Sequence, residues 1–421
     1  MDLHDIQRGV LSPRPSSYAA AYLAFRIDDR AAGRKLMRRV AAVVTSAADP
    51  AGPLGETWVS AAVTCHGLRA LGVPEKSLDS MAWEFRQGMA ARATVLGDTG
   101  PSAPDVWETP LGSPAVHVVL VALAPDTAML DAAIDRARPA YERLPGVTAI
   151  WRQDCHAPPA GTEPFGVRDG ISHPAVEGSG IPGSNPFETP LKAGEVVLGY
   201  PDELGGVQTT TPDVLGRNGS YVAFRKLRQD VAAFRRFLRA SADTDGEELM
   251  GRWRGGPQLA LAPERDALAL CGADALVLAG QDRGGSHIRR ANPRDSAVAG
   301  EVRLHRMIRR GTAYGPPLPE GVLDDDGADR GLLFAFVGAH LGRQFEFVQT
   351  EWLNNGVFFG AGDARDPIAA TGGPGTADST ILRRPVRRKL RGVPNFVTTR
   401  GGEYAFLPSL TALRWLGERR A

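Results

Sequence analysis

Three short stretches of the sequence contain residue types that could carry out chemistry. The first, GTEPFGVRDGISHPAVEG (161–178), places the carboxylate of Asp169 among turn-forming residues and outside any apolar pattern. A carboxylate in such a position either closes a turn or accepts a proton from a substrate. Taken alone, the residues of this stretch leave both interpretations open.

The second stretch, GQDRGGSHIRRANPRD (280–295), contains His287 shortly after two glycines. Glycine lets the backbone come close to a bound group, and imidazole is a common ligand of metals and cofactors. A lone histidine is nevertheless more often a structural residue. His287 is therefore a candidate ligand that needs support from elsewhere in the chain.

The third stretch, VRLHRMIRRG (302–311), reads as an arginine-rich strand. Side chains alternate between the two faces of a strand, so Arg303, His305, Met307 and Arg309 would share one face. Arg309 and Arg310 would then point in opposite directions. Only one of these two arginines can enter a given pocket, and the alternation does not say which.

The elements that must position these residues form two similar series. The first half predicts strands and helices in the order β-α-β twice, at 17–27, 28–44, 58–64, 116–124, 126–144 and 146–154. The second half repeats the pattern with a strand at 219–229, a helix at 230–242, strands at 302–311 and 331–339, and a helix at 340–355. Such series are typical of ferredoxin-like units. The insertion at 243–300 interrupts only the second series, and we expect a ligand there.

The composition excludes several classes of function. The chain has 421 residues, of which 43% are hydrophobic and 23% are charged, which suits a globular protein of two domains. Its formal charge of +1 provides no overall field that would attract nucleic acid or an anionic membrane. Motifs of nucleotide hydrolysis, α/β-hydrolases and zinc proteases do not occur.

The sequence also predicts a cytoplasmic protein. Its cysteines, Cys65, Cys155 and Cys271, lie far apart and form no CxxC pair, which argues against zinc and suits a reducing compartment. No window approaches 18 apolar residues, and the N-terminal residues match neither a signal peptide nor a twin-arginine signal. We therefore expect no membrane segment.

At this point a family resemblance becomes visible. FGVRDGISHP (165–174) resembles the GxxDG signature of dye-decolourising peroxidases, haem enzymes with two ferredoxin-like domains. Further stretches agree in the same order over nearly the whole length. They are DIQRGVL (5–11), GLRALGVPE (67–75), EFRQGMAARATVLGD (84–98), GSHIRRANPRD (285–295), RMIRRGTAYG (306–315), RQFEFVQTEWLNN (343–355) and RGGEYAFLPSL (400–410). The chain is most similar to the larger, cytoplasmic-type bacterial and fungal-like branches.

The resemblance implies a fold and a reaction. The expected fold is α+β, with two ferredoxin-like domains of antiparallel sheets at 1–160 and 161–421 and haem b in the C-terminal half. The expected activity is reduction of H2O2 and oxidation of organic substrates, such as dyes and phenols, by single-electron steps. We expect no nucleic-acid or membrane partner, and an oligomer is possible.

The resemblance also assigns residues. His287 becomes the ligand of the haem iron, Asp169 the distal carboxylate that shuttles a proton, and Arg309 the distal arginine that stabilises charge. Arg309 is preferred to Arg310 because the family places its arginine ahead of an aromatic-glycine pair, here Tyr314-Gly315. Where some relatives carry an asparagine, this chain has Gly311.

Other parts of the expected pocket rest on chemistry and position. Haem propionates need cationic partners, and the candidates are Arg289 and Arg294, with the basic run at 383–392 as a weaker one. Apolar walls are expected from Phe345 and Phe347, with Leu332 and Phe334 as further candidates. The partner of the ligand histidine and any surface electron relay remain open. The alternative function is a haem-binding or haem-handling protein with little turnover, and a third is a cofactor-free binder of small molecules.

Overall fold

The fold is known from a computed structural model. It describes residues 1–49, 56–158, 161–170, 172–184, 188–241, 249–250, 254, 287–293, 301–357, 364–372, 376–381 and 388–418. Arg294, Cys271 and most of the predicted insertion lie outside these residues. Among the helices that are described, none is both long and apolar enough to cross a lipid bilayer.

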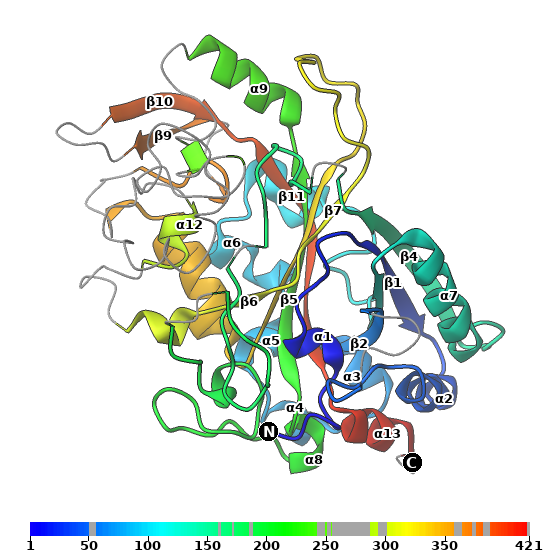
Figure 1. The fold of residues 1–421 in the computed structure, drawn as a ribbon. Helices are drawn as coiled ribbons and strands as arrows, with labels where there is room; N and C mark the ends of the chain where they lie inside the picture. The colour runs from blue at the N-terminus through cyan, green and yellow to red at the C-terminus, as the bar shows by residue number, and fades with distance from the viewer. Residues whose placement is uncertain are drawn as a thin grey trace.

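One antiparallel sheet runs through the centre of the molecule (Figure 1). The strands lie in the order β4-β1-β3-β2-β11-β5-β8-β6, and β7 pairs with β8 as well. Their bounds are β1 (Ala19–Ile27), β2 (Trp58–Thr64), β3 (Val118–Ala124), β4 (Val147–His156), β5 (Ser220–Gln229), β6 (Ile308–Arg309), β7 (Thr312–Tyr314), β8 (Gly331–Gly338) and β11 (Val397–Leu407). A separate hairpin joins β9 (Thr376–Ile381) to β10 (Arg388–Pro394).

The strand order confirms the predicted α+β fold with two ferredoxin-like units. In β4-β1-β3-β2 and in β11-β5-β8-β6, the fourth, first, third and second strands of each unit lie side by side. The two units share one continuous sheet because β2 pairs with β11, through Thr64 with Ala405 and Val63 with Phe406. The domain boundary at residue 160 stays a prediction.

An aspartate caps the first turn of three helices, as the sequence pattern favours. Its side chain accepts a hydrogen bond from Ala32 N in α2 (Arg30–Ala41, capped by Asp29), from Met129 N in α7 (Thr127–Ala137, capped by Asp126) and from Ala233 N in α9 (Val231–Ala240, capped by Asp230). The other α-helices in the described part of the chain are α1 (Arg8–Leu11), α3 (Cys65–Ala70), α4 (Glu75–Leu78), α5 (Trp83–Gln87), α6 (Ala93–Leu96), α8 (Asp213–Gly216), α12 (His287–Arg290) and α13 (Leu410–Glu418).

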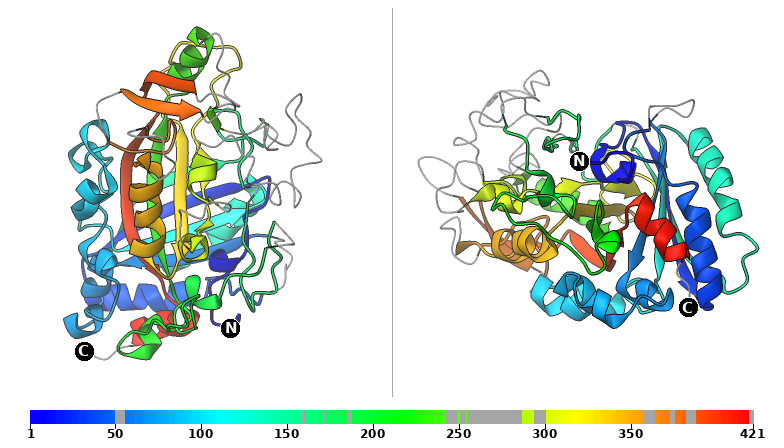
Figure 2. Two further views of the ribbon diagram at one scale, coloured as in Figure 1. Left: turned by 90° about the vertical axis from the view of Figure 1, so that its left-hand side faces the viewer. Right: turned by 90° about the horizontal axis from the view of Figure 1, so that it is seen from below.

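Both faces of β1 are buried. Along β1, Leu23 and Phe25 belong to a core that also contains the apolar faces of α2 and α7. Ala20 and Tyr22 point the other way, into a second core with Trp58 and residues of α1. Figure 2 shows α2 and α7 together on one side of the N-terminal unit. Burial on both faces explains why this strand contains almost no polar residues.

Two predicted elements differ from the structure. The strand predicted at 302–311 is wrong over its first part, since Val302–His305 forms a 3₁₀ turn. Glu301 favours this turn because its side chain accepts a hydrogen bond from Arg303 N at 3.2 Å. The helix predicted at 340–355 is present, but as wide π-helical turns at Leu341–Glu346 and Val348–Leu353. Such turns often occur next to functional sites.

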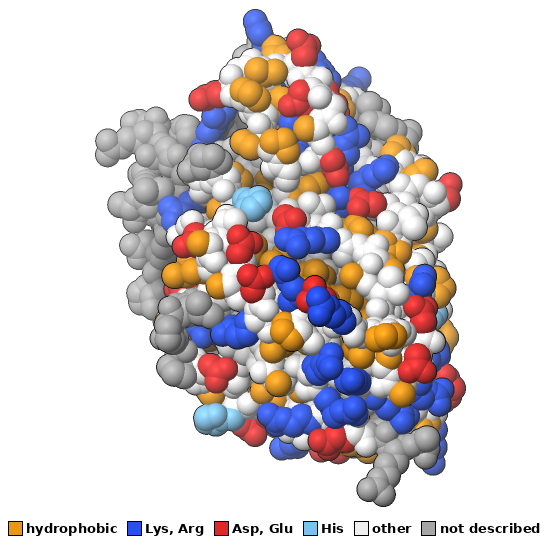
Figure 3. Space-filling view, turned by 90° about the vertical axis from the view of Figure 1, so that its right-hand side faces the viewer, with side chains coloured by type: hydrophobic (Ala, Val, Ile, Leu, Met, Phe, Trp, Pro, Cys, Tyr) orange, Lys and Arg blue, Asp and Glu red, His pale blue; other side chains and the backbone are white. Residues whose placement is uncertain are grey.

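The outer face over β4 and α7 carries basic and acidic side chains next to one another (Figure 3). Two ion pairs there are Arg26 with Asp28 at 2.7 Å and Arg152 with Asp154 at 2.8 Å. Exposed pairs of this kind contribute little to stability.

Candidate active site

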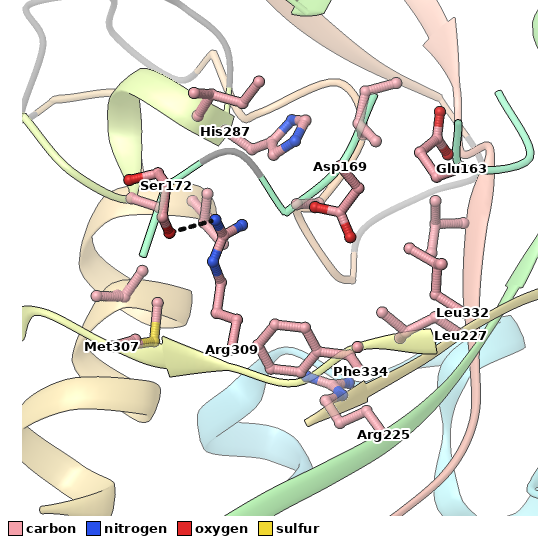
Figure 4. A pocket seen from close by; sticks show the side chains of 18 of the residues that line it. Glu163, Asp169, Ser172, Arg225, Leu227, His287, Met307, Arg309, Leu332 and Phe334 are labelled. Atoms are coloured by element: carbon pink, nitrogen blue, oxygen red, sulfur yellow. Dashed lines mark hydrogen bonds between the residues drawn. The ribbon is translucent and has the colours of Figure 1, made fainter. Parts of the chain in front are cut away.

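A large cavity lies in the C-terminal unit, beside β6 and β8 (Figure 4). The volume inside it that water-sized spheres can occupy is about 280 Å³. The walls are largely apolar and include Phe165, Val167, Leu332, Phe334, Phe345, Val348, Leu353 and Ile368. Asp169, His287 and Arg309 line the same cavity.

Asp169 lies on a tight loop that a second carboxylate organises. Glu163 accepts hydrogen bonds from Phe165 N at 3.0 Å, Val167 N at 3.1 Å and the amide of Gln229 at 2.8 Å. Burial raises the pKa of Glu163 to about 7. The loop then turns at Gly170, whose φ of 79° suits glycine.

The charge of Asp169 is set by two arginines. Burial would raise the pKa of Asp169, but the positive charges of Arg309 and Arg14 outweigh it and hold that pKa below its usual value. Asp169 Oδ2 also lies 3.3 Å from Arg14 Nη2. The carboxylate is therefore ionised at neutral pH and able to accept a proton.

The two adjacent arginines point in opposite directions, as strand alternation predicts. Arg309 on β6 lines the cavity and donates a hydrogen bond to Ser172 O at 3.4 Å (Figure 4). Arg310 is buried on the other side of the strand. There its guanidinium donates to the carbonyls of Gly9, Val10 and Leu11 at 3.1, 3.1 and 2.8 Å. Arg309 is thus the member of the pair that faces the cavity.

His287 is the first residue of α12, and it also lines the cavity. Its Nδ1 lies 3.9 Å from Oδ1 of Asp366, a carboxylate with no exposed surface. Asp366 Oδ1 also accepts hydrogen bonds from Ile368 N at 2.9 Å and Ala369 N at 2.6 Å. Its other oxygen is buried and accepts no hydrogen bond from the part of the chain that the structure describes. This places an anionic group behind the imidazole.

A buried arginine holds the histidine and this carboxylate in the same region. The guanidinium of Arg290, three residues after His287, donates to Trp352 O at 3.3 Å, Asn355 O at 3.1 Å and Ala364 O at 3.0 Å. These bonds tie α12 to the end of the helix that contains Trp352 and to the segment that leads to Asp366. Figures 1 and 2 show α12 against that helix.

The sequence did not identify Asp366 as the partner of His287. Its only local signal is the dipeptide Asp366-Pro367, which is typical of a turn. The hydrogen bonds from Ile368 N and Ala369 N are those of such a turn. Proximity to His287 depends on tertiary structure, which this dipeptide does not encode.

The other predicted pocket residues are placed as follows. Phe345 lines the cavity, together with Leu332 and Phe334. Phe347 instead stacks on His305, with ring centroids 3.9 Å apart and an angle of 10°. Arg289 is half-buried on α12 and is not among the described side chains that line the cavity. Arg294 lies outside the described residues, so both propionate assignments stay predictions.

A second cluster of possible metal ligands has a different explanation. Glu195, Asp202 and His340 come together near the start of the Leu341–Glu346 turn. Arg343 lies between the two carboxylates, 2.7 Å from Glu195 Oε1 and 3.2 Å from Asp202 Oδ2. Its guanidinium already balances part of their charge, so we interpret this cluster as a structural ion-pair network.

The residues around the main cavity fit an iron porphyrin. A porphyrin is large and apolar, needs one donor for its iron, and gains from an anionic group behind an imidazole donor. The cavity supplies a largely apolar lining, His287 supplies the donor, and Asp366 supplies the anion with one buried oxygen still without a described hydrogen-bond donor. The same cavity presents a carboxylate and a guanidinium for acid–base and electrostatic chemistry.

Comparison with known proteins gives relatives over most of the chain, although no protein-family model matches it. The dye-decolorizing peroxidase AauDyP1 of Auricularia auricula-judae is 30% identical over 398 residues, which are 82% of this chain and 73% of that protein. The multifunctional dye peroxidase DyP2 of an Amycolatopsis strain is 29% identical over 406 residues, with 86% and 83% covered.

Solved structures give the same result. A dye-decolorizing peroxidase in complex with 2,6-dimethoxyphenol is 26% identical, superposes with a TM-score of 0.80, and is matched over 99% of this chain and 100% of its own. An ancestral D-type dye-decolorizing peroxidase is 25% identical, with a TM-score of 0.83 over 98% of both chains.

Proposed function

Because the chain belongs to the dye-decolorizing peroxidase family, we propose that Asp169, Arg309 and His287 carry its peroxidase reaction. The enzyme is an oxidoreductase that uses peroxide as electron acceptor and oxidises dyes and phenols. The family does not by itself assign residues in this chain. The proposal for the three residues rests on their convergence on one cavity, with Asp366 behind His287.

His287 would hold the haem iron through Nε2, since its Nδ1 faces Asp366. Bound haem would supply the site for peroxide and for single-electron transfer. The buried carboxylate would fix the orientation of the ring and increase its basicity. We propose haem b, because the sequence has no CxxCH motif for covalent attachment.

Asp169 would act as the proton shuttle. Peroxide must lose a proton from the oxygen that binds and regain one on the oxygen that leaves. Because the two arginines keep the carboxylate ionised, Asp169 can accept the first proton at neutral pH and then donate it to the departing oxygen. The loop built around Glu163 keeps the carboxylate at the cavity wall.

Arg309 would stabilise negative charge as the O–O bond breaks. Its guanidinium faces the cavity and is oriented by Ser172 O, so it is available to a ligand without rearrangement of β6. A fixed cation in a pocket with apolar walls is more effective than one in water. Gly311, which also lines the cavity, adds no side chain that could assist.

The reductant is proposed to be a phenol or a dye. The solved relative mentioned above binds 2,6-dimethoxyphenol, which makes this compound a suitable first reductant for this chain. A cytoplasmic location is a further proposal, and buried unpaired Cys65 and Cys155 suit it.

The single observation that carries the proposal is that Asp169 and Arg309 face the cavity that contains His287 (Figure 4). A protein that only stores haem needs neither residue. The test is an absorption spectrum of the haem-loaded protein before and after one equivalent of H2O2, followed by 2,6-dimethoxyphenol. A peroxidase gives a rapid Soret change that the phenol reverses with oxidation of the phenol. A Soret band that does not respond to peroxide would favour the haem-handling alternative.

A further inference from the structure

One cation of the N-terminal segment before β1, the guanidinium of Arg14, contacts the site of the C-terminal unit. The side chain of Arg14 is 17% exposed, and its Nη2 lies 3.3 Å from Asp169 Oδ2. Its guanidinium also lies over the ring of Tyr18, 4.5 Å from the ring centroid. The hydroxyl of Tyr18 accepts a hydrogen bond from Ala313 N of β7 at 2.7 Å, which fixes the ring. Arg14 is therefore held from one side by an aromatic ring and aimed at the carboxylate on the other.

The segment that carries Arg14 is itself anchored by Arg310. Three carbonyls of α1, from Gly9 to Leu11, accept hydrogen bonds from the buried Arg310 guanidinium. Arg14 follows this anchored turn by three residues. Arg310 directly follows Arg309, the last residue of β6. These two neighbouring arginines therefore act on Asp169 in two different ways. Arg309 approaches through the cavity, and Arg310 fixes the segment that brings Arg14.

Arg14 and Arg309 differ in how they act on Asp169. Arg309 directs its hydrogen bond to Ser172 O and is available to a ligand. Arg14 donates to Asp169 itself and is not among the described residues that line the cavity. Because Arg14 touches the carboxylate and the cavity lies beyond it, the strongest effect of Arg14 is on Asp169 itself.

We propose that Arg14 is a positioning residue that holds the Asp169 carboxylate ionised and fixed in orientation, and that Arg310 positions Arg14. The inference rests on the proposed role of Asp169 and deepens it. It also gives the N-terminal segment a role in the site of the C-terminal unit, through the contact of Arg14 with Asp169. Among the residues that the structure describes, the charged and titratable groups around Asp169 are Arg14, Arg309, Arg168 and Glu163 on the same loop, Tyr18, and His287 in the same cavity.

The direct test measures the proton affinity of Asp169 without turnover. The infrared carbonyl band of its protonated carboxyl group is obtained as the difference between the wild-type protein and Asp169→Asn, and it is titrated with pH. Arg14→Met removes one of two nearby cations, so the midpoint of this pH titration should rise by about one pH unit. Arg14→Lys should return the midpoint close to the wild-type value, because it restores the charge.

A matched control is Arg8→Met, which removes an arginine of α1 whose guanidinium reaches Asp49 O on the exterior. Its midpoint should equal that of the wild type. An unchanged midpoint in Arg14→Met, or an equal shift in Arg8→Met, would overturn the proposal. Circular dichroism and thermal unfolding identify any variant that does not fold, and Arg14→Lys then supplies the comparison.

The role of Arg310 is tested with a double-mutant cycle. If Arg310 acts through Arg14, Arg310→Met should shift the midpoint in the same direction, and the double variant should shift it no further than Arg14→Met alone. Additive shifts would contradict this part of the proposal.

Failure of the proposed function gives a different result. If Asp169 is the proton shuttle, the rate of the peroxide reaction should fall in acid, and the pH at which it falls should move with the infrared midpoint. If the midpoint moves in Arg14→Met but the rate profile does not, Arg14 still controls the charge of Asp169, whereas Asp169 is not the proton shuttle. If the rate profile moves while the midpoint stays constant, the inference about Arg14 is wrong.

Discussion

Asp366 Oδ1 lies 3.9 Å from His287 Nδ1, in a position that no solvent reaches. A carboxylate behind a ligand imidazole holds the ring in one tautomer and increases its affinity for metal. Asp366 is itself held by two backbone N–H groups, so its carboxylate has a fixed position.

Asp366→Asn should therefore lower the affinity for haem by about 10–100-fold, because the amide keeps the shape of the side chain but loses its charge. The affinity is measured by titrating apoprotein with haem and following the Soret band. Asp154→Asn, an exposed aspartate paired with Arg152, is the control and should have no effect. Equal affinities for Asp366→Asn and the wild type would mean that the carboxylate does not support the ligand.

Removal of the ligand itself should have a larger effect. His287→Ala should abolish the Soret spectrum of a histidine-ligated haem, and added imidazole should restore part of it. The control is His305→Ala, because His305 stacks on Phe347 and does not line the cavity. A normal spectrum in His287→Ala, with loss in His305→Ala, would move the iron ligand to His305.

Arg309→Leu should slow the first spectral change after peroxide addition by about 10²–10³-fold, with haem binding retained. The reason is that the guanidinium faces the cavity, so its loss removes charge stabilisation and leaves the haem ligand in place. Stopped-flow absorption measures the rate. Arg303→Leu removes an arginine paired with Glu203 and should leave the rate unchanged. A wild-type rate in Arg309→Leu would exclude the assigned role.

Stability should depend on pH through Glu403, which lies in the sheet centre on β11. This carboxyl is buried, accepts one hydrogen bond from Gly112 N at 2.6 Å, and burial raises its pKa to about 8. The folded protein thus keeps a proton that the unfolded chain loses above its ordinary pKa. Folding stability from this group is present in acid and is lost as pH rises from about 4.5 to about 8.

Glu403→Gln should remove that loss, because the amide is neutral at every pH. We expect the variant to gain roughly 2–4 kcal/mol over the wild type at pH 8.5 and little at pH 5, measured by denaturant unfolding. A gain that is the same at both pH values would show that Glu403 is not protonated in the folded protein.

The apolar strands were predictable from the sequence alone. The strands at 17–27, 58–64, 116–124 and 219–229 correspond to β1, β2, β3 and β5, because runs of alanine, valine and leucine suit a sheet with both faces buried. Aspartate caps gave the starts of α2 and α7 for a similarly local reason.

Features that depend on close approach between distant segments were not predictable. No element was expected at 397–407, although β11 joins the two units there. Gly401 and Gly402 interrupt its apolar pattern. In the structure, a Cβ on Gly402 would lie 2.3 Å from Met89 Sδ, so glycine allows the N-terminal unit to pack on this strand. From sequence, such a pair cannot be distinguished from a turn.

The residues of the candidate site also fall into two groups, those that a local sequence motif surrounds and those without one. Asp169, His287 and Arg309 were found because motifs surround each of them, and their positions on one cavity are consistent with the proposal. Asp366 and Arg14 have no motif, since each acts through a residue far away in sequence. Their function depends on the tertiary contacts at 3.9 Å and 3.3 Å.

The most direct test of the central claim is the rate at which haem-loaded Asp169→Asn reacts with one equivalent of H2O2. The asparagine keeps the size of the side chain but cannot accept a proton. We predict an unchanged resting Soret spectrum and a first spectral change about 10²–10⁴-fold slower than in the wild type at neutral pH. A wild-type rate with full haem occupancy would contradict the account, because the proton would then be moved by another group.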